Sequence, residues 1–179
     1  MRQAIFLAAK MEELLGRSEV LLSAVPKNED SSMMTDRTLL VNALTYAGAL
    51  PFAAMLLAVL LGVNNLPLLG SPTKVSLIYG AVIASFLAGS HWGIFIAFGD
   101  KIGSAVAIIS NCAAILIWIS VLIFPDVLSL SVLALVFAGL LLVDFKLAKA
   151  AAITQSYLTL RIRITSLVVL LLIGHVWAL

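Results

Sequence analysis

The chain has 179 residues, of which 63% are hydrophobic and 11% are charged, and its mean hydropathy is +1.16. Soluble globular domains have about half apolar and about a quarter charged residues, so the composition excludes that class and indicates an integral membrane protein. The formal net charge of +2 is too small to indicate a nucleic-acid partner. The single Cys112 excludes an internal disulfide.

Residues 1–34 differ in character from the rest, because they mix both charge signs with short apolar runs. They fit neither a secretory signal, which needs a longer apolar core, nor a mitochondrial presequence, which avoids acids. One interpretation is an interfacial amphipathic helix, and the other is a flexible tail or an extension upstream of a start at Met33 or Met34. The residues that would share one helical face are Leu7, Met11, Leu14 and Leu15.

Residues 35–179 predict an all-α transmembrane domain with five spans. About 20 apolar residues are needed to cross a bilayer, and the first three stretches reach that length alone. The fourth is extended through Phe145, and the fifth includes Arg161 and Arg163, whose long stems let the charges reach the headgroups. Pro51 predicts a bend in the first helix. The predicted spans cover about residues 39–61, 75–99, 102–124, 127–145 and 159–178.

The distribution of Lys and Arg between the connections predicts the orientation. With alternate crossings, one face carries Arg37, Lys101, Lys146, Lys149, Arg161 and Arg163, whereas the other carries Lys74. The positive-inside rule then places the N-terminus in the cytoplasm and the C-terminus outside.

Several segments together carry a resemblance to a known family. They are "LTYAGALPFAAMLLAVLL", "YGAVIASFLAGSHWG", an aspartate closing the fourth span (Asp144) and "YLTLRIRITSLVVL". In these the chain resembles, over about residues 38–179, the bacterial family of short membrane proteins related to eukaryotic transmembrane protein 69. The most specific piece is "SFLAGSHWG". The resemblance implies five spans in a bacterial cytoplasmic (inner) membrane, and because the family has no known function it implies no catalytic or ligand residue.

The polar residues of the spans are predicted to gather in the cytoplasmic half. A tight turn at Asp100/Lys101 makes the second and third spans antiparallel neighbours, which places His91 level with Asn111. A second tight turn at Pro125/Asp126 places Asp144 about one helical turn from His91. We therefore expect His91 to point into the bundle, within reach of Asn111 or Asp144. The candidate cluster comprises His91, Asn111, Asp144, Arg161, Arg163 and Asn42.

The role of this cluster stays open at the level of sequence. An ionisable group inside a membrane is a functional candidate, yet a hydrogen-bonded histidine also serves packing alone. The position of Asp144 is consistent with an anchor at the membrane interface and equally with an acid that takes part in proton transfer. Zinc would need three converging ligands, for which His91, Cys112 and Asp144 are the available set.

No catalytic residue, cofactor or metal is predicted. Ser90 and His91 form no catalytic dyad, because consecutive residues of a helix point in different directions. We expect a non-enzymatic accessory or assembly protein, with the bilayer and another membrane protein or a second copy as partners. The alternative is a small-solute or proton pathway through His91 and Asp144. Close helix packing is predicted along Gly80, Ala84, Ala88 and His91, flanked by Ala81, Ser85, Gly89 and Gly93.

Overall fold

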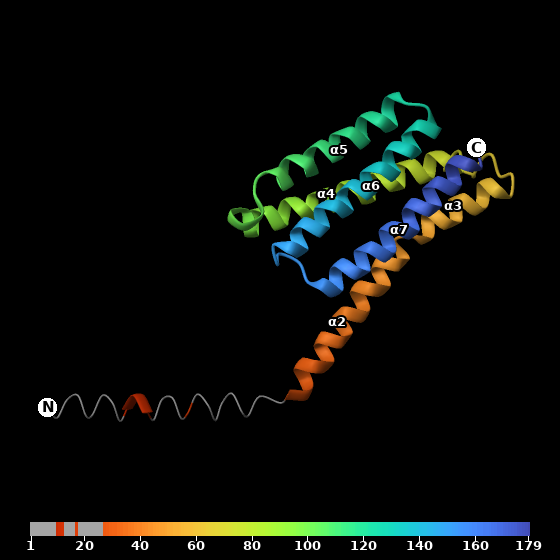
Figure 1. Cartoon of the computed structure of the whole chain (residues 1–179). Coiled ribbons are helices and arrows are strands. Elements are labelled where there is room, and N and C mark those ends of the chain that lie inside the picture. Colours follow the sequence, from red (N-terminus) through yellow and green to blue (C-terminus); the bar gives the residue numbers. More distant parts are fainter. Residues whose placement is uncertain (1–9, 13–16, 18–26) are drawn as a thin grey trace. The chain divides into compact units, whose positions relative to one another are not determined.

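The computed structural model describes residues 10–12, 17 and 27–179. Its contacts divide the chain into two units, residues 1–43 and Leu44–Leu179. Helix α2 (Lys27–Ala47) begins in the first unit and ends in the second (Figure 1). Most of the predicted N-terminal segment, including the proposed amphipathic face, lies outside the described residues.

Within the described residues, five helical segments are long and apolar enough to cross a membrane, as predicted. No strand occurs there beyond one isolated bridge between Leu66 and Gly70. Each segment lies within a few residues of its predicted span. The segments are Thr38–Leu60, Pro72–Gly99, Ala105–Ile123, Asp126–Lys149 and Gln155–Trp177.

The first segment is interrupted where Pro51 predicts a bend. Helix α2 ends at Ala47, and α3 (Leu50–Leu60) begins with the proline in its first turn, where a missing N–H costs nothing. The Tyr79 hydroxyl donates a hydrogen bond of 3.0 Å to the Gly48 carbonyl at the interruption. This bond satisfies a backbone acceptor that the broken helix leaves open.

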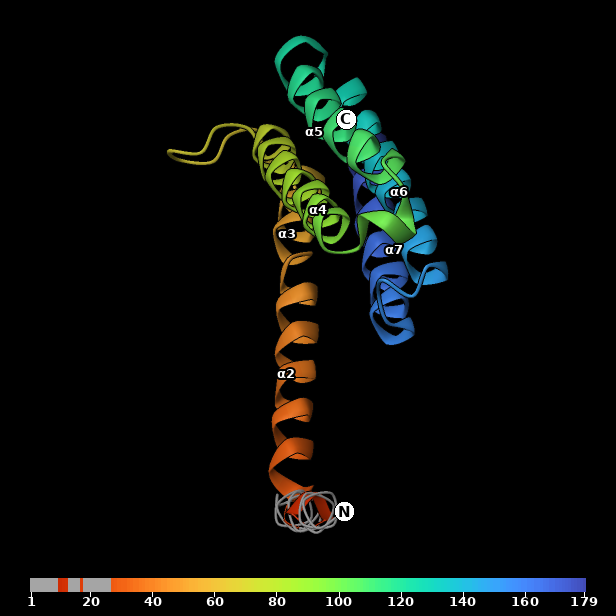
Figure 2. The same ribbon diagram turned by 90° about the vertical axis from the view of Figure 1, so that its left-hand side faces the viewer.

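The remaining helices are α4 (Pro72–Ile102), α5 (Ala105–Ile123), α6 (Asp126–Lys149) and α7 (Gln155–Trp177). Helix α4 packs against α3, α5 and α6, while α7 packs against α6 and α3. Helices α3, α4, α6 and α7 therefore form a closed ring of neighbours, with α5 against the outer side of α4 and α6 (Figures 1 and 2). The inner sides of α4, α6 and α7 are consequently shielded from the surroundings.

The buried residues on these inner sides recur every three or four residues, the spacing that keeps one face of a helix against its neighbour. In α6 the buried series is Leu130, Leu133, Phe137, Leu140, Asp144 and Leu147. In α7 it is Leu158, Arg161, Thr165, Val168, Leu172 and His175. We call each buried series the inner stripe of its helix. Most of its positions are hydrophobic, and a few are polar.

Small residues on α4 allow its neighbours to approach closely, as expected. Gly80 is buried, and a Cβ atom built there would overlap Leu133 Cδ2 and lie 3.1 Å from a ring carbon of Phe52. The flanking series behaves differently, since Gly89 and Gly93 are exposed and a Cβ there would meet nothing within 4 Å. The Gly80 stripe therefore packs the bundle, whereas these two glycines face outward.

The turn between the second and third spans lies later than predicted. Helix α4 is kinked at Phe98 (φ −132°, ψ 20°), continues to Ile102 and ends at Gly103, whose φ of 74° is readily adopted by glycine. The third span accordingly begins at Ala105 rather than at residue 102.

Candidate functional site: a buried His–Asp–Arg triad

Three ionisable side chains meet inside the bundle. His91 Nε2 lies 2.7 Å from Asp144 Oδ1, and Arg161 Nε donates to Asp144 Oδ2 at 2.8 Å. His91 and Asp144 are each 1% exposed and Arg161 is 5% exposed. We call these three residues the triad; it joins α4, α6 and α7 through a single carboxylate.

The triad forms because each residue lies on the inner stripe of its helix. Asp144 follows Leu140 by four residues and precedes Leu147 by three, so its side chain shares their buried face. In α7, Arg161 follows Leu158 by three residues and precedes Thr165 by four, so it also shares a buried face. The helix periodicity therefore brings the three side chains inward before any ionic attraction acts.

The electrostatics of the triad follow from its burial. A buried carboxylate is costly unless it is paired, and here the two oxygens have separate donors. With a neutral imidazole, the charges of Asp144 and Arg161 cancel. A neutral ring that donates from Nε2 leaves Nδ1 as a bare acceptor, and this atom is buried without a partner.

The other predicted members of the cluster do not join the triad. Asn111 is exposed and donates to the Ala107 carbonyl of its own helix, so the expected contact with His91 is absent. The physical reason is that Asn111 lies on an exposed face of α5, whereas the adjacent Ser110 is buried. Arg163 is exposed, since it lies two residues from Arg161 and therefore on another helix face. Asn42 belongs to the N-terminal unit and is not among the residues of the triad.

Metal ligands do not converge in the described part of the chain. Cys112 is exposed, away from the buried stripe that carries His91 and Asp144. Among residues 10–12, 17 and 27–179, no three His, Cys, Asp or Glu side chains form a group that could hold a metal ion.

Sequence reasoning missed the polar neighbour of the triad on α7. Thr165 is 3% exposed, and its Oγ1 atom and Arg161 Nη2 are both buried without a hydrogen-bond partner. The signal was available, because Thr165 follows Arg161 by four residues and therefore shares its face. Threonine is common in transmembrane helices, however, and spacing alone does not reveal an unpaired hydroxyl.

A second buried polar contact lies elsewhere in the bundle. His175 Nε2 is 3.3 Å from Thr73 Oγ1, and both residues are buried. The contact joins the end of α7 to the start of α4, whereas the triad joins the start of α7 to later turns of α4 and α6. The two histidines thus have separate partners.

Taken together, the apolar spans and the buried ionic triad are those of a multi-pass α-helical membrane protein. The chain belongs to the family described as Protein of unknown function (DUF3429), whose model matches residues 39–177. This match covers all five spans and leaves out most of the N-terminal unit. Comparisons with curated proteins and with solved structures gave no match.

The triad predicts a specific pattern of stabilities in mutants. Asp144→Leu leaves the Arg161 guanidinium buried without its counter-charge, which should lower the free energy of unfolding by about 3–5 kcal/mol. The double variant Asp144→Leu/Arg161→Leu removes both charges and should recover most of that loss. Thermal or denaturant unfolding in a fixed detergent measures both effects.

Arg163→Leu provides the matched control, because it removes an exposed arginine from the same helix and should change stability little. Equal destabilisation by the single and double variants would contradict the pairing. So would an Arg163→Leu effect as large as that of Asp144→Leu.

Proposed function

We propose that the chain is a non-enzymatic accessory or assembly protein of a membrane, in which the triad holds α4, α6 and α7 in one register. The observation that carries this proposal is the pairing of both Asp144 oxygens within the bundle. A carboxylate with two close partners is well suited to fixing the positions of helices. Polar residues at buried positions serve such a role in other helix assemblies.

The chemistry near the triad supports a role other than catalysis. The hydroxyl nearest in sequence, Ser90 Oγ, donates to the Leu87 carbonyl at 2.7 Å and is therefore engaged with its own helix. Ser110 likewise donates to Ala107. Within the described residues, these hydroxyls are held by backbone carbonyls rather than by the histidine that would have to activate them.

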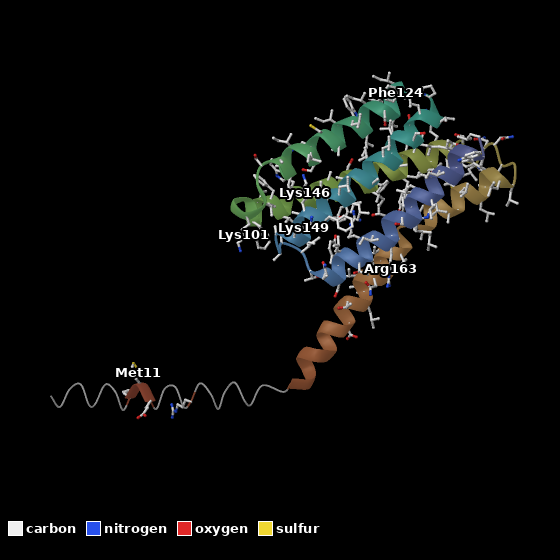
Figure 3. The ribbon with its side chains drawn as sticks, viewed as in Figure 1. Met11, Lys101, Phe124, Lys146, Lys149 and Arg163 are labelled. Carbon is white, nitrogen blue, oxygen red and sulfur yellow. The ribbon has the colours of Figure 1, made fainter. Side chains whose placement is uncertain are left out.

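The membrane and the orientation are part of the same proposal. Lys101, Lys146 and Lys149 lie at one end of the bundle and Phe124 lies at the other (Figure 3). The positive-inside rule places the lysine end in the cytoplasm, the N-terminus on that side and the C-terminus outside. On the resemblance of "SFLAGSHWG", we assign the chain to the bacterial relatives of eukaryotic transmembrane protein 69 and to a bacterial cytoplasmic membrane.

Reporter fusions test the orientation. Alkaline phosphatase fused after Leu179 should be active, because that end is exported, whereas a fusion between residues 150 and 154 should be inactive. Green fluorescent protein at the same two sites should give the opposite pattern. Reversal of both reporters would contradict the proposed orientation, and equal behaviour at the two sites would contradict a fifth span.

Gentle purification tests the accessory role. Extraction of the tagged chain into nanodiscs, followed by mass spectrometry, should show one stoichiometric membrane-protein partner or a second copy. Asp144→Asn should lose that partner, because it leaves Arg161 without its counter-charge and loosens the register. Arg163→Gln should retain it. An unmodified chain that purifies as a monomer without a partner would overturn this role.

One observation favours a second function, a proton or small-solute pathway. His91 Nδ1 is a buried atom without a partner, on a ring that also contacts a carboxylate. Such a ring can accept a proton at one nitrogen and release one at the other. A monomer that carries a pH-dependent proton flux in liposomes, abolished by His91→Gln, would support this function in place of the first.

A further inference from the structure

The connection between α3 and α4, residues 61–71, carries large apolar side chains that the bundle leaves uncovered. Leu61 and Leu69 are exposed, and Leu68 is exposed completely. No Asp, Glu, Lys, Arg or His occurs between Arg37 and Lys74, so the connection and the span before it form one uncharged segment. Large apolar side chains gathered outside a folded core mark a surface that contacts a membrane or another molecule.

The tip of this connection is a turn in which Leu68 has a strained backbone. The Leu69 N–H donates to the Leu66 carbonyl at 3.2 Å, which closes a four-residue turn. Pro67 is its second residue, and Leu68, its third, has a φ of 68°. This is the pattern of a type II turn, whose third position favours glycine or asparagine. In water, leucine at this position would be unfavourable for both the backbone and the exposed side chain, so its presence indicates an apolar environment around the tip.

The backbone of the turn is largely hydrogen-bonded to itself. The Leu66 N–H donates to the Gly70 carbonyl at 2.8 Å, and the Gly70 N–H donates to the Leu66 carbonyl at 3.1 Å. Pro67 has no N–H that needs a partner. Irregular loops are kept out of hydrocarbon chiefly by backbone groups without partners. Because this turn satisfies most of its own groups, it can lie in a layer less polar than water.

The level and the direction of the connection fit the surface of a membrane. Thr73, at the start of α4, contacts His175 near the end of α7, and the exposed Trp177 follows two residues later. Tryptophan is enriched where a membrane meets water, so the base of the connection lies at the level of that interface. From this level the connection extends sideways from the bundle (Figure 2). A loop that extends sideways there runs along the lipid layer beside the helices.

We propose that residues 66–69 form a lipid anchor, in which Leu68 and Leu69 insert among the acyl chains at the edge of the leaflet where α3 ends. Lipid is the occupant because the anchor continues an apolar surface of α3. Leu57 and Leu60 are exposed on that helix, within a segment apolar enough to cross a membrane. The anchor fixes the height of α3 and α4 in the bilayer. The inference requires that the bundle lies in a bilayer, and it holds whether or not the chain has a protein partner.

Spin-label accessibility tests the anchor in the full chain, reconstituted into phosphatidylcholine nanodiscs. Cys112→Ser removes the single native thiol, and Leu68→Cys then carries a nitroxide. Oxygen concentrates in hydrocarbon and a neutral nickel chelate concentrates in water, so the ratio of their collision rates with the label reports its depth. Oxygen should relax the label at position 68 more than nickel does.

Ala151→Cys is the matched control. Ala151 is also an exposed residue with a positive φ, of 55°, in a turn between spans, but its turn follows Lys149. Nickel should relax that label more than oxygen does. A label at position 68 that prefers nickel would overturn the proposal. Low accessibility to both reagents there would also overturn it, because protein rather than lipid would then cover the loop.

A charge on the anchor tests insertion without a label at position 68. The nitroxide is placed at Leu69→Cys, and Leu68→Asp should raise its nickel accessibility severalfold, because a carboxylate is strongly unfavourable in hydrocarbon. Leu68→Met keeps an apolar side chain at the same strained position and should preserve the preference for oxygen. An equal oxygen preference in the aspartate and methionine variants would contradict the anchor.

Discussion

The Asp144 carboxylate imposes the constraint on which the rest of the bundle depends. It is 1% exposed within a segment apolar enough to cross a membrane, where an unpaired charge is strongly unfavourable. The sequence meets this constraint by supplying His91 from α4 and Arg161 from α7, one to each oxygen. Because the donors come from different helices, the carboxylate is satisfied only when α4, α6 and α7 stand in a single relative register.

The apolar packing is arranged around the same register. Gly80 leaves room on α4 for Leu133 of α6, and Phe52 lies between the rings of Tyr79 and Phe137, with centroids 5.1 and 6.1 Å away. Dispersion contacts of this kind drive helix association in lipid, where the hydrophobic effect between helices is weak. The apolar contacts hold the helices close, and the triad adds a directional contact that a sliding movement would break. Arg161 contacts the carboxylate through Nε, while its Nη2 atom is buried without a hydrogen-bond partner.

The sequence predicts the helices well because each span is a continuous apolar run bounded by charges or turn residues. It also predicts the partners His91 and Asp144, since both follow from counting residues away from short turns. Asn111 does not contact His91, because it lies on an exposed face of α5 and donates to the Ala107 carbonyl, and counting residues from a turn does not show which face a side chain occupies. The unpaired Oγ1 of Thr165 depends on how several helices pack around it, which no spacing within one helix reveals.

The most direct measurement of the central contact is a nitrogen–carbon dipolar coupling by solid-state NMR in lipid. In a His175→Gln variant, ¹⁵N-histidine labels His91 alone, and ¹³C-aspartate labels every aspartate carboxylate, including that of Asp144. We expect His91 Nε2 to show strong dephasing from a carboxylate carbon, as a hydrogen bond of 2.7 Å requires, and Asp144→Ala to abolish it. An Nε2 signal without dephasing in the folded protein, or dephasing that persists in Asp144→Ala, would contradict the triad.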